Sequence, residues 1–190
     1  MKEIRTAELR TENPAGSSEL VLIGRPIVFD VPTTIGGALG SYTEIIKRGA
    51  LDGADLSDVR LLYAHDTSKV PLARTPKTMQ LSVTPAGLEL KASLPNTTDG
   101  QSVYTAVQRG DLSGMSFAFK VPVAGDAFDA KTNTRTINKI EKVYEISVVT
   151  FPAYPQTSVE ARDAMTAAKE RAGQIALAQE KINQIMKRSV

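Results

Sequence analysis

The chain has 190 residues, of which 42% are apolar, enough for one compact domain with a buried core and an appendage. Its 23 Lys and Arg against 21 Asp and Glu leave a formal net charge of +2, which is too small to indicate a nucleic-acid partner. The absence of cysteine excludes disulfides, a thiol nucleophile and thiolate metal sites, and it fits a reducing compartment.

Strand patterns dominate most of the chain. Segments that alternate apolar and polar residues, or that are rich in β-branched residues, are predicted as strands. In chain order they are 19–29, 59–64, 79–84, 88–94, 115–123, 134–140 and 143–151. Pro85, Ala86 and Gly87 supply turn chemistry and predict a hairpin between two of these strands. The stretches 13–18 and 33–41, rich in Gly, Ser and Thr, are predicted as loops.

Helical patterns are fewer in this part of the chain. Residues 43–51 are predicted as a short helix that stops near a glycine. Residues 99–110 carry a stronger signal, because Thr98 or Asp99 can cap the helix and Gly110 can end it. Strands and helices together predict a β-rich α+β fold with a few short helices.

A change in composition near Pro152 and Pro155 predicts a boundary between a body, residues 1–160, and a tail, residues 161–190. The tail is predicted to be helical, with an apolar seam at three- and four-residue spacing that suits packing against another helix. It holds six Lys and Arg against three Asp and Glu, which leaves 17 basic and 18 acidic residues in the body. The tail is therefore basic, and we expect it to contact another protein.

No targeting, membrane or metal signal stands out. The segment MKEIRTAELR lacks the apolar run of a signal peptide, and no stretch approaches the ~18 uninterrupted apolar residues of a membrane span. We therefore expect a cytoplasmic protein without a membrane partner. Asp52, Asp55 and Asp58 recur at every third residue, but they lack the alternate spacing and closing Glu of a calcium loop, so no metal or cofactor is expected.

His65 is the only histidine, so any histidine base within this chain is His65. It ends the apolar run 59–64 and opens into a polar loop, where a base can be both held and exposed. Ser116 follows Gly114 at the start of a predicted strand, and the two-residue period places Phe117 on the opposite face, leaving the serine hydroxyl free. A nucleophilic serine needs such a base, but the pattern alone supports no more than a β-rich domain.

Four segments, in this order, resemble the prohead protease family of tailed bacteriophages, whose fold is similar to that of herpesvirus assemblin. They are YTEIIKRGAL (42–51), VRLLYAHDTSKVPLART (59–75), LSVTPAGLELKASLPNTTDGQSVYTAVQRGDLSGMSFAFKV (81–121) and YEISVVTFPAYPQTSVEAR (144–162). The ordered set AHD, LSGMSFAF and EISVVTFPAYPQT is the specific part of the resemblance. It implies an antiparallel, β-barrel-like core of the assemblin type.

The resemblance also implies the residues of a site. His65 of AHD is the expected base and Ser116 of GMSFAF the expected nucleophile, with Ser113 as the nearest competitor. Assemblin-like proteases use a second histidine as the third member, which this chain lacks, so an acid must replace it or the site is a dyad. Glu145 is the expected acid because a carboxylate on a late core strand can reach the imidazole, and Asp66 is the alternative.

By this resemblance the chain is a serine endopeptidase of the assembling procapsid in the host cytoplasm. It is expected to cleave a scaffold protein, or the scaffolding segment of the major capsid protein, and itself. The expected partners are those capsid proteins and further copies of this chain, and the tail 161–190 is expected to direct packaging and then to be removed. Two other classes remain open, namely a non-enzymatic assembly protein of the same fold and a β-rich peptide-binding module with a helical tail.

Overall fold

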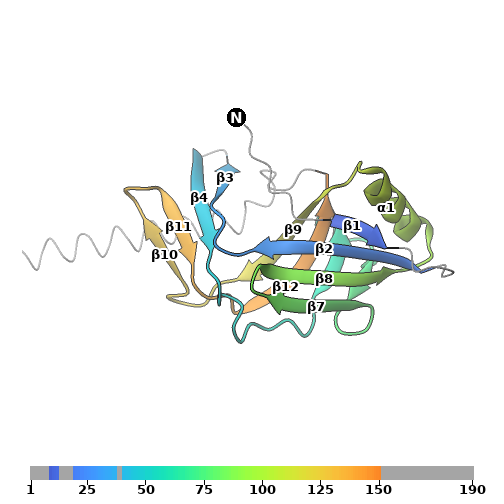
Figure 1. Ribbon diagram of the computed structural model, residues 1–190, viewed down its shortest axis with the longest axis horizontal. Coiled ribbons are helices and arrows are strands. Elements are labelled where there is room, and N and C mark those ends of the chain that lie inside the picture. The colour runs from blue at the N-terminus through green and yellow to red at the C-terminus, as the bar shows by residue number, and fades with distance from the viewer. Residues whose placement is uncertain (1–8, 13–18, 38–39, 151–190) are drawn as a thin grey trace, which may run out of the picture.

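The computed structural model describes residues 9–12, 19–37 and 40–150, which form a β-rich α+β fold with one α-helix. The strands make three four-stranded sheets (Figure 1). One cluster of buried apolar side chains draws on all three sheets and on the helix, so the described residues share a single core.

The first sheet is antiparallel throughout, in the order β1-β2-β8-β7. Its strands are β1 (Leu9–Glu12), β2 (Leu20–Val28), β8 (Gly87–Leu94) and β7 (Met79–Thr84). Along β8, Leu88, Leu90 and Ala92 are buried and alternate with Glu89 and Lys91, as the sequence pattern predicts. Burying each such leucine contributes about 2 kcal/mol to stability, which fixes the register of the predicted hairpin.

The second sheet lies at one end of the molecule, with the helix at the other end (Figure 1). Its order is β10-β11-β4-β3, and β11 pairs with β4 in parallel. The strands are β10 (Asp126–Asp129), β11 (Thr134–Ile137), β4 (Gly40–Ile46) and β3 (Thr33–Gly37). Because β11 and β4 lie far apart in the sequence, this sheet depends on long-range pairing.

The third sheet carries the residues that the sequence singles out. Its order is β6-β5-β12-β9, where β5 and β12 are parallel and β12 and β9 antiparallel. The strands are β6 (Ala73–Arg74), β5 (Arg60–Tyr63), β12 (Lys142–Val149) and β9 (Gly114–Lys120). Every residue of β12 from 145 to 149 is buried, which makes it a core strand.

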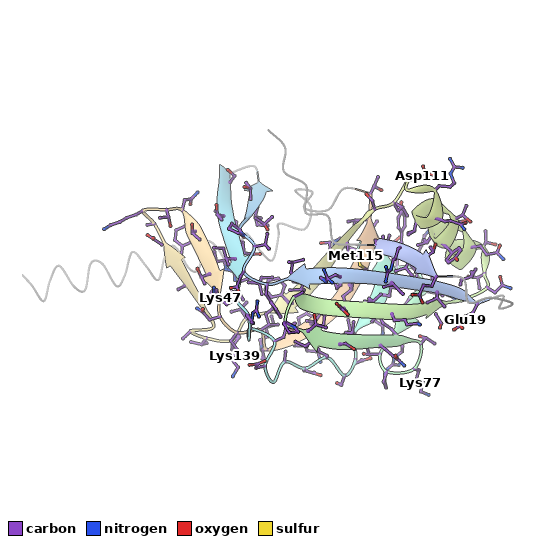
Figure 2. The ribbon with its side chains drawn as sticks, viewed as in Figure 1. Glu19, Lys47, Lys77, Asp111, Met115 and Lys139 are labelled. Atoms are coloured by element: carbon purple, nitrogen blue, oxygen red, sulfur yellow. The ribbon has the colours of Figure 1, made fainter. Side chains whose placement is uncertain are left out.

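Helix α1 (Thr98–Arg109) packs against β1, β2 and β8. Thr97 is the N-cap, one residue before the predicted caps, and its side chain accepts a hydrogen bond from the backbone N–H of Gly100. Gly110 ends the helix as predicted, because its φ of 80° is left-handed and glycine adopts that conformation without strain. In Figure 2, Met115 of β9 lies in the interior of the body, whereas Asp111, between α1 and β9, lies at its rim.

Three expectations from the sequence need correction. No closed barrel forms among the described residues, and two of the strand pairs are parallel, so the core is not an antiparallel barrel. The helix predicted over 43–51 is wrong, because the chain is strand β4 through Ile46 and then turns. The loop predicted over 33–41 is also wrong, because β3 pairs antiparallel with the beginning of β4.

The reason for the missed strand is a charge at an inward position. Tyr42, Glu44 and Ile46 are buried in β4, and an acid in the middle of that set hides the alternation of a half-buried strand. The predicted tail, 161–190, lies outside the described residues. No helix in the described part of the chain has the length and apolar character that crossing a bilayer requires.

Candidate active site

The order of the third sheet brings three distant segments side by side. His65 lies two residues after the end of β5, Glu145 lies on β12, and Ser116 lies on β9. Since β12 is hydrogen-bonded to both β5 and β9, all three predicted residues come from adjacent strands. Pairing within one sheet therefore supplies the proximity that sequence spacing could not predict.

A β-bulge at Tyr144 turns Glu145 toward this site. In the register of β12 against β9, Val143 is opposite Phe119 and Glu145 is opposite Ala118, so Tyr144 has no partner. The extra residue lets Val143, Ile146 and Val148 all face the core, while Glu145 faces the other side of the sheet. Bulges commonly re-aim a side chain next to a functional site.

His65 sits in a tight turn with an unfavourable backbone conformation. Ala64 and His65 both have left-handed φ values, 53° and 59°, and the backbone N–H of Asp66 donates to the carbonyl of Tyr63 at 3.0 Å. Two successive positive φ angles define a type I′ turn, which favours Asn and Gly. For residues with a Cβ each left-handed position costs about 1–2 kcal/mol, and such strain persists where the surroundings hold it in place.

The imidazole of His65 is held by Glu145. Its Nδ1 lies 2.6 Å from Oε1 of Glu145, and the side chains are 30% and 11% exposed, respectively. With the proton on Nδ1, this nitrogen donates to the carboxylate and Nε2 carries the free lone pair. Nε2 is buried and has no hydrogen-bond partner among the described residues. The ring is therefore oriented at one nitrogen, and the other nitrogen keeps an unused lone pair, as a general base requires.

Ser147 completes what we call the histidine cluster, namely His65, Glu145 and Ser147. Its hydroxyl donates to Oε2 of Glu145 at 2.6 Å and accepts from the backbone N–H of His65 at 3.1 Å. Ser147 was not anticipated from the sequence. The available signal was its position two residues after Glu145, on the same face of the strand and among the apolar residues 146–149.

Ser116 is directly opposite Ser147 in the pairing of β9 with β12. Opposed residues of an antiparallel pair point to the same face with Cβ atoms about 5 Å apart, so Ser116 shares the face of Glu145 and Ser147. Phe117 is opposite Ile146 and packs on the core, which confirms the predicted separation of faces. No hydrogen bond joins Ser116 to Nε2 of His65 among the described residues, and such bonds often tighten only when substrate binds.

The alternative residues have other partners. The carboxylate of Asp66 accepts hydrogen bonds from the backbone N–H and the hydroxyl of Ser68, at 2.9 and 2.5 Å. These bonds, the hydroxyl first, hold the pKa of Asp66 below its usual range. Ser113 is exposed in the connection before β9. The structure thus brings His65 and Glu145 together and leaves Asp66 and Ser113 apart from them.

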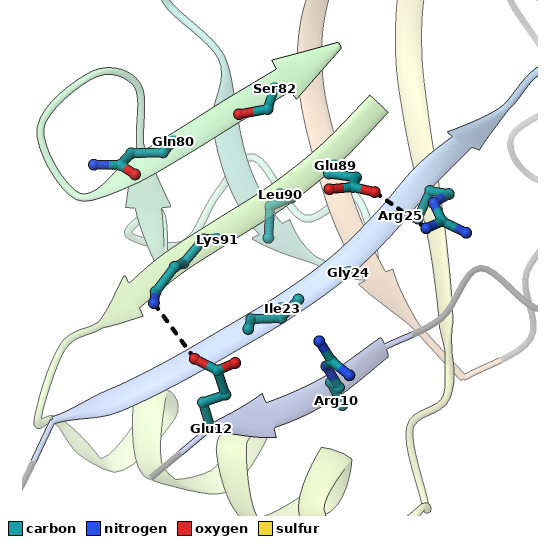
Figure 3. Close-up of a pocket in the computed structure, with 10 residues that line it drawn as sticks. All are labelled: Arg10, Glu12, Ile23, Gly24, Arg25, Gln80, Ser82, Glu89, Leu90 and Lys91. Carbon is teal, nitrogen blue, oxygen red and sulfur yellow. Dashed lines mark hydrogen bonds and ion pairs between the residues drawn. The ribbon is translucent and has the colours of Figure 1, made fainter. Parts of the chain in front are cut away.

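A hollow lies on the outer face of the first sheet (Figure 3). Four of its charged side chains form two ion pairs, Arg25 with Glu89 at 3.1 Å and Lys91 with Glu12 at 3.4 Å. No histidine lines it. No group of three or more metal-ligating side chains occurs in the described ranges either, so the third sheet holds the best candidate for chemistry.

A second buried polar group lies in the second sheet. We call it the arginine cluster, and it consists of Arg135, Asp126, Glu44 and Tyr42. Arg135 is 2% exposed, and its guanidinium binds Asp126 at 2.8 Å and Glu44 at 3.1 Å. The hydroxyl of Tyr42 donates to Glu44 at 3.4 Å. Burial, and after it the charge of Glu44, raise the pKa of Tyr42 to about 12, so this hydroxyl stays protonated. These contacts join β4, β11 and β10.

The fold and the site together define the class of the protein. It is a β-rich protein in which neighbouring strands of one sheet carry, or lead into, a serine, a histidine and a carboxylate. The sequence profile described as caudovirus prohead serine protease matches residues 5–171. Because that match covers most of the chain, the chain belongs to this family, as its motifs predict.

A curated relative is the prohead protease of Enterobacteria phage HK97. It is 28% identical over 142 residues, which cover 73% of this chain and 61% of the relative. The match therefore spans about three fifths of that relative's own length. No solved structure matches the chain significantly.

Proposed function

We propose that this chain is a serine endopeptidase of phage capsid maturation, with Ser116 as nucleophile, His65 as general base and Glu145 as the acid that orients the base. The observation that carries the proposal is the hydrogen bond between His65 Nδ1 and Glu145, at 2.6 Å, with a buried and unpartnered Nε2 on the other side of the ring. Family membership supports the reaction class.

The reaction follows from these positions. Ser116 Oγ attacks the scissile carbonyl while His65 Nε2 takes the hydroxyl proton, and the resulting imidazolium is stabilised by Glu145. The imidazolium then gives its proton to the leaving amine, which frees one product and leaves an acyl group on Ser116. A water molecule, deprotonated by His65, hydrolyses that ester and restores the serine.

The position of β9 supports binding of an extended peptide. β9 is the last strand of its sheet in the described part of the chain, and no strand there pairs with its outer edge. An unfolded segment that adds to such an edge forms main-chain hydrogen bonds and presents its carbonyl groups beside the strand. The proposed substrates are therefore extended segments of the scaffold protein or of the scaffolding region of the major capsid protein, together with segments of this chain.

The test is co-expression of the chain with the major capsid protein of the same phage. The wild type is expected to produce cleaved capsid protein, and Ser116→Ala to produce none, because removal of a nucleophilic serine costs about 10⁶-fold in rate. Ser113→Ala is the matched control, since it removes an exposed hydroxyl three residues away, and it should cleave as the wild type does. Cleavage by Ser116→Ala, or intact capsid protein with the wild type, contradicts the proposal.

We also propose that residues 161–190 direct the protease to the scaffold inside the procapsid in the host cytoplasm and are later removed by self-cleavage. The basic charge and apolar seam of this segment support helix contact with another protein. Deletion of residues 163–190 should leave cleavage intact and reduce the amount of protease in purified procapsids. Normal incorporation of the deletion variant contradicts this role.

A further inference from the structure

We propose that Ser147 is a positioning residue of the reaction, which holds both the carboxylate and the backbone that carries the base. The inference rests on the proposed function, because it assigns Ser147 a role in activating Ser116 through His65. Ser147 is fully buried, and its two hydrogen bonds go to two different parts of the site.

The first bond fixes the carboxylate. Glu145 has two oxygens, and Oε1 faces His65 at 2.6 Å while Oε2 accepts from the hydroxyl of Ser147 at 2.6 Å. A carboxylate held at only one oxygen rotates about its last bond, whereas bonds at both oxygens fix its plane. Ser147 therefore determines the direction from which Glu145 meets the imidazole.

The second bond fixes the turn. The backbone N–H of His65 donates to Ser147 Oγ at 3.1 Å, and this backbone is in the left-handed conformation at both Ala64 and His65. Strained residues keep such a conformation only when neighbouring groups hold them. The N–H of Ala64 donates to the carbonyl of Val148, so hydrogen bonds to β12 hold both Ala64 and His65.

Ser147 is not itself placed to act as the nucleophile. Its proton is directed to Glu145, its side chain has no exposure, and it lies on the Glu145 side of the ring. Ser116 is partly exposed on the neighbouring strand, directly opposite. One buried hydroxyl thus links the base, the acid and the strand that faces the nucleophile.

The experiment measures reaction of Ser116 with an alkyl fluorophosphonate, a probe that needs no knowledge of the natural substrate. Ser116 Oγ bonds to phosphorus, fluoride leaves, and His65 takes the hydroxyl proton, so the maximal rate reports activation of the serine. Wild type, Ser116→Ala, Ser147→Ala and Thr75→Val are compared, and mass spectrometry locates the modified residue. Thr75→Val is the matched control, because Thr75 is also buried and its hydroxyl also makes two hydrogen bonds, with the N–H of Val59 and the carbonyl of Leu56.

Ser147→Ala is expected to lower the maximal rate about 10- to 100-fold with an unchanged half-saturating probe concentration, since a misplacement of about 1 Å in a catalytic group costs about 10²-fold. Thr75→Val should lower the melting temperature while keeping the maximal rate. Labelling of wild type at Ser116 with an unchanged rate in Ser147→Ala overturns the inference and leaves the proposed function intact. An equal loss of rate in Ser147→Ala and Thr75→Val also overturns it, because the effect is then one of folding. Equal labelling of wild type and Ser116→Ala overturns the proposed function, and the role of Ser147 with it.

Discussion

The histidine cluster and the arginine cluster are both polar and largely buried, but they differ in whether every buried nitrogen has a hydrogen-bond partner. In the arginine cluster, no buried side-chain nitrogen of Arg135 lacks a hydrogen-bond partner, and its charge meets two carboxylates. In the histidine cluster, Nδ1 of His65 is bound while the buried Nε2 has no partner among the described residues. The buried nitrogens of Arg135 thus all have partners, whereas His65 keeps one nitrogen that can still accept a hydrogen bond.

This difference separates a structural role from a chemical one. A saturated buried ion cluster fixes which strands pair, and removing one partner leaves a buried charge uncompensated. A buried nitrogen without a partner costs stability, and it is retained where a ligand or a transferred proton will occupy it. We therefore expect mutations in the histidine cluster to affect rate and those in the arginine cluster to affect stability.

Among variants within the two clusters, Glu145→Gln should have the largest effect on the rate. An amide in place of the carboxylate can donate to Nδ1, which favours the tautomer with the proton on Nε2 and blocks that nitrogen as a base. By analogy with other serine–histidine–acid sites, peptide cleavage should fall by about 10⁴-fold. Stopped assays with purified protein measure the rate, and calorimetry should show a melting temperature close to that of the wild type. A variant with more than a tenth of wild-type activity contradicts the role of Glu145.

Arg135→Met should have the largest effect on stability. It leaves Glu44 and Asp126 buried without their cation, and loss of one partner of a buried ion pair costs about 3–5 kcal/mol in the free energy of unfolding. Urea denaturation measures this loss, and the folded fraction should label with fluorophosphonate at the wild-type rate. Arg109→Met is the control, because its ion pair with Asp111 is exposed and contributes about 0–1 kcal/mol. Equal destabilisation by the two variants contradicts the structural role of the arginine cluster.

A smaller effect is expected for Tyr42→Phe, which removes the hydroxyl that donates to Glu44. At neutral pH the loss should be about 1 kcal/mol. Because the pKa of Tyr42 is raised from 10.0 to about 12 in the folded protein, the neutral hydroxyl favours folding below pH 10. As the pH rises from 10 to 12, the unfolded chain releases the tyrosine proton while the folded chain keeps it, so the wild type should lose its advantage over Tyr42→Phe and then become the less stable of the two. A constant difference across that range contradicts the assignment.

Elements with a local sequence pattern could be predicted, whereas elements with a buried charge could not. The hairpin of β7 and β8 and the helix ended by Gly110 follow from local patterns, and both were predicted. The sequence analysis misses strands β4 and β10, because each places an acid, Glu44 or Asp126, at an inward position. Burial of these acids depends on their ion pairs with Arg135, which is distant from Glu44 in the sequence. Local periodicity assigns buried positions to apolar residues, so it fails where a charge is buried with its partner.

The candidate site was predicted from motifs and from the single histidine, whereas its geometry was not. The bulge at Tyr144 and the left-handed turn at Ala64 and His65 depend on pairing between β5, β12 and β9, which no local pattern encodes. The part played by Ser147 depends on the same pairing. Residue identity could be inferred from the sequence, but the direction of each side chain required the strand register.

The central claim is that Glu145 holds the His65 ring with its proton on Nδ1 and with Nε2 free to act as a base. Because His65 is the only histidine, a proton–nitrogen correlation spectrum of isotope-labelled protein reports this ring without assignment ambiguity. For the neutral ring, we predict a protonated Nδ1 and a bare Nε2 in the wild type, and the opposite tautomer in Glu145→Gln. A wild-type ring protonated on Nε2, or one that averages between the tautomers as a free imidazole does, would contradict the account.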